Sequence, residues 1–194
     1  MQYPLDLRFT IFSFAQKITV SDASGNSILF VRQKMFRFKE KIEVFSDSSQ
    51  KNKLFEINAD RILDFSANYS FTGADGSDWG SVRRHGMRSL WSAHYEVIEN
   101  NRVEMHIREE APWKKFLESF LGQIPIVGMI PDYFLNPSYL ITMADGIPAF
   151  RALKKPSLVE RHFVIEKRIE LDEDDELLAL LSIIMMVLLE KSRG

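Results

Sequence analysis

Hydrophobic and polar residues alternate along much of this chain, but one segment near its end breaks the alternation. From Leu177 to Leu189 every residue is apolar except Ser182. A surface helix carries an apolar stripe, whereas a helix that is apolar on every side has to be buried on every side. Acidic residues precede the run and basic residues follow it, as the dipole of a helix favours. The pattern predicts a buried core helix over 174–191.

Three other segments resemble one another, because each is an alternating strand that ends in a turn with a glycine. They cover residues 18–25, 69–76 and 139–146. Glycine tolerates the positive φ that a tight hairpin turn needs, so each segment predicts a β-hairpin. Each hairpin opens a related meander of strands. We predict these three meanders at residues 17–60, 68–110 and 138–170.

The meanders, with an N-terminal strand near 5–14, give about twelve strands, and a sheet of that size tends to close on itself. A barrel that wide cannot be filled by its own side chains, but a helix can fill it. We therefore expect one mainly β domain over residues 1–194. Its predicted architecture is a closed antiparallel barrel of about twelve strands around a central hydrophobic C-terminal helix.

One insertion separates the second meander from the third. Residues 112–122 have the spacing of a short amphipathic helix that includes Trp113, Lys114, Lys115 and Phe116. Its aromatic face could dip into a membrane interface, with the two lysines at the head groups. Alternatively, the same face closes one mouth of the barrel.

Several phrases of the chain resemble a known family. They are VRQKMFRFKEK at 31–41, GMRSLW at 86–91 and NPSY at 136–139, in that order and before an apolar C-terminal helix. Their order resembles the LURP-one-related family, which shares the tubby-like fold with tubby proteins and phospholipid scramblases. The resemblance covers essentially the whole chain and implies a twelve-stranded barrel around a central helix. Because tubby proteins bind phosphoinositides and scramblases act on lipids, it also points toward lipid. The chain lacks the cysteine-rich palmitoylation site and the proline-rich arm of scramblases.

The composition argues against several kinds of chemistry. The net charge is −2, so no global field favours nucleic acid, and the absence of cysteine excludes disulfides, thiolate metal sites and cysteine nucleophiles. No pair of histidines has the close helical spacing of a metal site, although His94 and His106 could lie on neighbouring strands. The chain also has no G-x-S-x-G elbow and no P-loop. We therefore expect no catalytic residue, no metal and no cofactor, and a protein that is not an enzyme.

Basic residues follow the second strand of each repeat, and they are the strongest candidates for a binding site. They are Arg32, Lys34, Arg83, Arg84, Lys154 and Lys155. If the repeats run the same way around the barrel, these residues form one basic rim, which would attract phosphate head groups. The alternative is that they are solvated turn residues balanced by nearby acids.

Two functional hypotheses follow from the sequence. The first is a non-enzymatic binding module for anionic phospholipid or phosphoinositide head groups, and the alternative is a protein-interaction scaffold with no lipid role. The N-terminus lacks the basic and apolar regions of a signal peptide, so we expect a cytoplasmic protein, peripheral to a membrane under the first hypothesis. The apolar run near the C-terminus, at roughly 20 Å, is shorter than the roughly 30 Å hydrocarbon core. A short tail anchor is the remaining alternative for that run.

Overall fold

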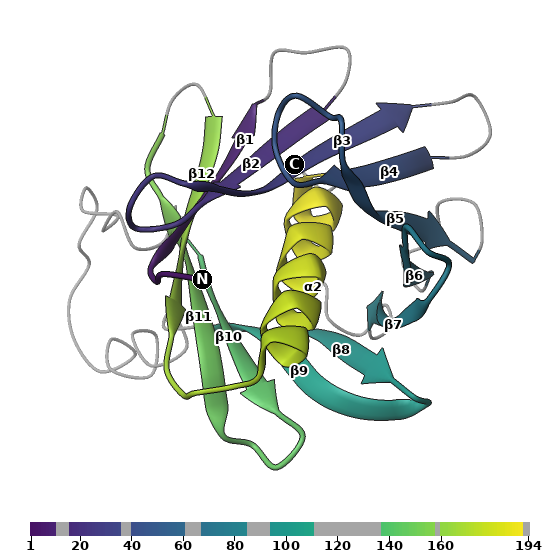
Figure 1. Cartoon of the computed structure of the whole chain (residues 1–194). Coiled ribbons are helices and arrows are strands. Elements are labelled where there is room, and N and C mark those ends of the chain that lie inside the picture. Colours follow the sequence, from purple (N-terminus) through teal and green to yellow (C-terminus); the bar gives the residue numbers. More distant parts are fainter. Residues whose placement is uncertain are drawn as a thin grey trace, which may run out of the picture.

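The computed structural model describes residues 1–10, 16–35, 40–60, 67–84, 94–110, 137–157 and 160–191 of the chain. In this described part, twelve strands form a closed antiparallel barrel and α2 (Glu173–Lys191) passes through its middle (Figure 1). The strands are β1 (Leu5–Thr10), β2 (Gln16–Ser21), β3 (Ser27–Met35), β4 (Glu40–Phe45), β5 (Lys53–Ala59), β6 (Asn68–Gly73), β7 (Asp78–Arg84), β8 (His94–Glu99), β9 (Arg102–Glu110), β10 (Ser138–Met143), β11 (Pro148–Lys155) and β12 (Glu160–Lys167). Consecutive strands are neighbours, and β1 pairs with β12 to close the barrel. The predicted fold class is confirmed.

Side chains alternate between the inside and the outside of the barrel, as the pleat of a strand requires. In β1, for example, Leu5, Leu7 and Phe9 are fully buried, and the residues between them are polar or charged and less buried. These inward residues pack with α2 in one continuous core. The helix is buried along its whole middle, from Leu178 to Leu188. An apolar helix is thus stable here because strands cover every side of it.

The three related hairpins have matching geometry. Gly25, Gly76 and Gly146 have φ values of 83°, 88° and 90°, a conformation that side chains rarely adopt. In each hairpin, the strand residue seven positions before the glycine pairs with the strand residue six positions after the glycine. These pairs are Ile18 with Val31, Tyr69 with Val82, and Tyr139 with Ala152. A register shift follows at a similar place in each hairpin. The sequence similarity of these segments therefore reflects equivalent positions in the sheet.

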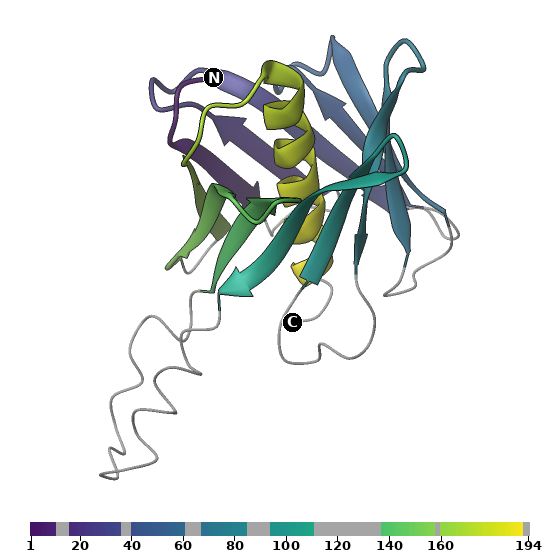
Figure 2. The ribbon, with the colours of Figure 1, turned by 90° about the horizontal axis from the view of Figure 1, so that it is seen from below.

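Because neighbouring strands are antiparallel, all three glycine turns lie at one end of the barrel, which we call the turn end. The basic stretches lie at the opposite end, which we call the basic end, where β3, β7 and β11 finish. The helix α2 begins at the turn end, where Asp172 Oδ1 accepts a hydrogen bond of 2.9 Å from the Asp175 backbone N–H. It then runs through the barrel toward the basic end (Figure 2).

The helix lies closest to β7 and β8, and Gly80 on β7 permits that approach. A Cβ atom at Gly80 would lie 2.5 Å from the Ile98 carbonyl oxygen and 3.4 Å from Leu178 Cδ1. Its φ of 91° also favours glycine. The sequence pattern does not distinguish this glycine from the turn glycines, because its role depends on two other elements.

Two further predictions from the sequence concern the basic stretches and the inserted helix. The basic stretches were expected to follow their strands as rim loops, but the residues at 32, 34, 83, 84, 154 and 155 all lie within β3, β7 and β11. Charged side chains can occupy outward-facing positions without breaking the alternation, as those of Arg32, Arg83 and Lys155 do, and the inward-facing Arg84 and Lys154 lie at the ends of their strands. The predicted helix over 112–122 lies outside the described residues.

Candidate functional site

The two ends of the barrel carry exposed charges of opposite sign. Among the described residues, the exposed cations of the basic end are Arg8, Lys17, Arg83, Arg108 and Lys155, and its exposed acid is Asp60. The exposed acids of the turn end are Asp75, Asp78, Asp145, Glu170, Asp172, Glu173 and Asp174, against Lys51, Arg102 and Arg168. The acids of the turn end also affect one another, since burial and then the charge of Asp175 raise the pKa of Glu99.

Two of the predicted rim residues point outward and pair with acids on the next strand. Arg32 Nη2 lies 2.8 Å from Glu43 Oε2, and Arg83 Nη2 lies 2.7 Å from Glu96 Oε2. The two arginines occupy equivalent positions in the first two repeats, and each faces its partner directly in the sheet. The charge of each arginine is therefore largely balanced within the protein.

Arg84 points into the barrel instead. Its side chain is buried, and its guanidinium carbon lies 5.8 Å from the centre of the Tyr95 ring. The Tyr95 hydroxyl donates a hydrogen bond of 2.6 Å to Glu190 near the end of α2. Burial, and then the charge of Glu190, raise the pKa of Tyr95. Arg84 thus belongs to a polar group that holds the end of the helix against β7 and β8.

In the third repeat, the two adjacent lysines likewise face opposite sides of the sheet. Lys155 is exposed, whereas Lys154 lies directly opposite the buried Phe163 and is half-buried. Burial, and then the charge of Arg161, lower the pKa of Lys154. Adjacent residues of each basic stretch therefore have different surroundings.

Several other residues bear on the predicted site. Lys34 lies on β3, and its side chain is outside the described part of the structure. Trp113, Lys114, Lys115 and Phe116 are also outside it. Conversely, Lys17, Arg108 and Arg161 lie at the basic end without having been singled out from the sequence. The signal that could have found them is their position at the end of a predicted strand.

The comparison with known families decides the identity of this barrel. The pattern of the LURP-one-related family matches residues 5–149. The chain belongs to that family. The match reaches from β1 to the start of β11, so β12 and α2 lie beyond it. Both elements still belong to this LURP-one-related barrel, because β12 closes it and α2 fills it. No curated protein and no solved structure matches the chain.

The histidines of this LURP-one-related chain include one close pair. His94 Nε2 and His106 Nδ1 lie 3.3 Å apart on β8 and β9, which confirms that they are on neighbouring strands. In the described part of the chain, no group of three or more histidines and acids is placed to hold a metal ion. No helix in that part is long and apolar enough to cross a membrane.

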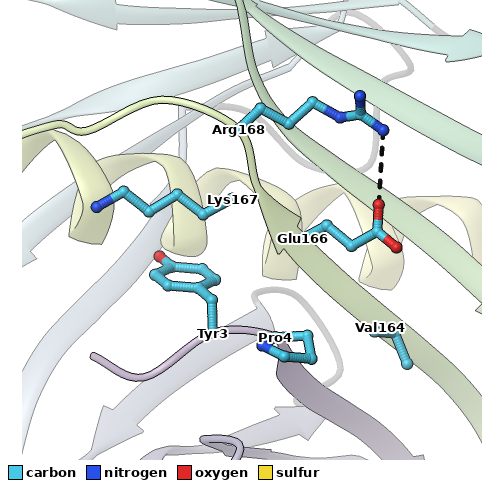
Figure 3. A pocket seen from close by; sticks show the side chains of 6 residues that line it. All are labelled: Tyr3, Pro4, Val164, Glu166, Lys167 and Arg168. Carbon is cyan, nitrogen blue, oxygen red and sulfur yellow. Dashed lines mark ion pairs between the residues drawn. The ribbon is translucent and has the colours of Figure 1, made fainter.

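A depression of about 650 Å³ lies near the turn end and is lined by Tyr3, Pro4, Val164, Glu166, Lys167 and Arg168 (Figure 3). Its charged groups are engaged with one another. Arg168 Nη2 lies 3.5 Å from Glu166 Oε2, and the Lys167 ammonium lies over the Tyr3 ring and pairs with Glu176 at the start of α2. The Tyr3 hydroxyl also donates to Glu176 at 3.3 Å. This region therefore serves to fasten the N-terminus and β12 to the helix.

Replacing Lys167 with Met should strongly destabilise the protein, because it would leave the buried Glu176 carboxylate without its cation. Side-chain exposure is 14% for Lys167 and 8% for Glu176. Breaking a buried pair on one side costs about 3–5 kcal/mol, whereas replacing both partners costs far less. Chemical denaturation of Lys167→Met should show this loss, and the double variant Lys167→Met/Glu176→Gln should recover most of it. Equal stability of the single variant and the wild type would contradict a structural role for the pair.

Proposed function

We propose that this LURP-one-related protein is a non-enzymatic binding module for anionic phospholipid head groups. It would approach a membrane with its basic end first, as a peripheral protein in the cytoplasm. The observation that supports this most directly is the separation of exposed charge along the barrel axis. Membership of the LURP-one-related family adds support, because that family resembles the tubby-like barrels that bind lipid.

The separation matters because the protein as a whole is slightly acidic. With a net charge of −2, an even charge distribution would repel an anionic surface. A basic end and an acidic turn end instead give the molecule a preferred orientation in the field of the membrane. Each lysine or arginine near an anionic leaflet contributes about 1 kcal/mol. Since Arg8, Arg32 and Arg83 are paired with acids, the exposed Lys17, Arg108 and Lys155 are the best placed to contribute.

Sedimentation with vesicles tests this proposal. The protein should bind vesicles of phosphatidylcholine mixed with phosphatidylserine and should ignore vesicles of phosphatidylcholine alone. Binding should fall steeply as salt rises from about 0.1 M to about 1 M, because the screening length falls from about 10 Å to about 3 Å. A protein that ignores anionic vesicles even at low salt would overturn the proposal and favour the protein-interaction scaffold.

A further inference from the structure

A hydrogen bond joins two histidines on the outer face of the barrel, toward its basic end. His94 is the first residue of β8 and His106 lies on β9, with His94 Nε2 3.3 Å from His106 Nδ1. Their neighbours along the strands, Tyr95 and Ile107, are fully buried, so the alternation of the strands directs both histidines outward. Both imidazoles are half-buried. The pair therefore lies on the part of the surface that the proposed function turns toward a membrane.

The bond between the two imidazoles limits how many protons the pair can hold. A neutral imidazole has one nitrogen that donates and one that accepts, whereas a protonated imidazole can only donate. When one ring is protonated, it donates a charge-assisted hydrogen bond to the other ring. When both are protonated, neither facing nitrogen can accept, and two positive charges meet across 3.3 Å. These limits depend only on the two facing nitrogens, whatever the other nitrogen of each ring contacts. The pair should therefore take up one proton readily and resist a second.

The pair belongs to a group of charged side chains on β7, β8 and β9, which we call the histidine cluster. Glu96 lies directly opposite His106 and two residues from His94, on the same face of β8. Arg83 holds the Glu96 carboxylate at 2.7 Å, and the exposed Arg108 lies directly opposite His94. The cluster thus has two arginines against one carboxylate. It carries a single positive charge while both imidazoles are neutral, and one proton on the pair doubles that charge.

Other described residues around the pair leave this charge balance as it is. On β10, the residues opposite His106 and Arg108 are Thr142 and Leu140, which carry no charge. Further along β9, Glu110 is paired with Arg151 at 2.7 Å, and Glu104 lies toward the turn end. Histidine is the side chain whose ordinary titration falls between about pH 5 and pH 8. The pair is therefore the part of this surface that is expected to respond to pH near neutrality.

We infer that the His94–His106 pair is a proton-sensitive element that tightens binding of the basic end to an anionic membrane as the pH falls. This regulation rests on the function proposed above. The proton adds its charge on the outer surface, beside Arg108, where an anionic leaflet attracts it. The coupling is reciprocal, so a surface that binds the protonated form more tightly also favours uptake of the proton. One added charge near an anionic leaflet should tighten binding about fivefold.

Nuclear magnetic resonance tests the coupling of the pair without lipid. In the wild-type protein, the ring signals of His94 and His106 should not follow a single titration step, because the protons belong to the pair as a whole. In His94→Gln, the signals of His106 should follow a single step. His162→Gln is the matched control, since it removes a histidine on β12, three strands from β9, and should leave the curves of the pair unchanged. Single steps for both histidines in the wild type, unaltered by loss of the partner, would overturn the inference.

Vesicle binding tests the consequence for the membrane. Vesicles of phosphatidylcholine mixed with phosphatidylglycerol are suited to it, because the phosphodiester of phosphatidylglycerol keeps its charge near neutral pH. The double variant His94→Gln/His106→Gln removes both titrating rings and keeps polar side chains at two outward positions, so thermal melts should show a retained fold. Between about pH 7.5 and about pH 5.5, the wild type should gain about fivefold more affinity than the double variant.

The possible results separate the two proposals. If both proteins bind the vesicles and gain equally as the pH falls, the inference is overturned and the proposed function stands. If neither protein binds at either pH, the proposed function is overturned, and this regulation is overturned with it.

Discussion

Replacing Ile184 with Asp is expected to leave no cooperatively folded protein. Ile184 has no exposed surface and lies in the middle of α2, inside the barrel. Burying an unpaired carboxylate costs several kcal/mol, and a domain of ordinary stability has only about 5–15 kcal/mol to lose. Leu180→Asp should act in the same way, since Leu180 is 2% exposed. Soluble yield and thermal melts followed by circular dichroism would measure the loss.

Ile147→Asp is the matched control. It makes the same chemical change at a residue that is 49% exposed beside the Gly146 turn, so it should fold with nearly unchanged stability. If Ile184→Asp melted as cooperatively as Ile147→Asp, the helix could not be the covered centre of the barrel in solution.

The overall fold could be predicted from sequence because its signals are local and agree with one another. The run from Leu177 to Leu189 is apolar on every side, which requires complete burial. The glycines at 25, 76 and 146 mark turns at equal spacing from matching strand residues. Neither signal depends on knowing where distant parts of the chain lie, and together they predict a barrel with a filled centre.

The surroundings of the basic residues could not be predicted in the same way. Alternation shows that Arg83 and Arg84 face opposite sides, but the pairing of Arg83 with Glu96 depends on the register between β7 and β8. The proximity of Lys154 to Arg161 likewise depends on how β11 pairs with β12. A single sequence indicates which residues are basic. Which of them are paired with acids, buried or exposed depends on the register between neighbouring strands.

The contact between Tyr3 and Glu176 illustrates a second limit. The two residues are 173 positions apart, and they meet because β1 and β12 close the barrel beside the start of α2. No local pattern around Tyr3 indicates a partner in the helix. Such contacts follow from closure of the barrel, so they become visible only after the whole strand order is known.

Reversing two exposed cations of the basic end should abolish binding to anionic vesicles. The double variant Lys17→Glu/Lys155→Glu replaces attraction with repulsion at the surface proposed to face the membrane. Each cation near an anionic leaflet contributes about 1 kcal/mol, and its reversal adds a repulsion of similar size. Binding should therefore weaken by well over about a hundredfold, since about 1.4 kcal/mol corresponds to a factor of ten. Both residues are exposed, so the fold should be retained.

The variant Lys51→Glu/Arg102→Glu makes the same change of net charge at the turn end, where both residues are also exposed. If net charge alone governed attraction, the two double variants would lose vesicle binding equally. If the basic end faces the membrane, the turn-end variant should lose far less, because its new charges lie on the far side of the barrel and beyond the screening length of about 8 Å at physiological salt. Equal losses would therefore refute an oriented approach, and unchanged binding of the basic-end variant would refute the basic end as the membrane-facing surface.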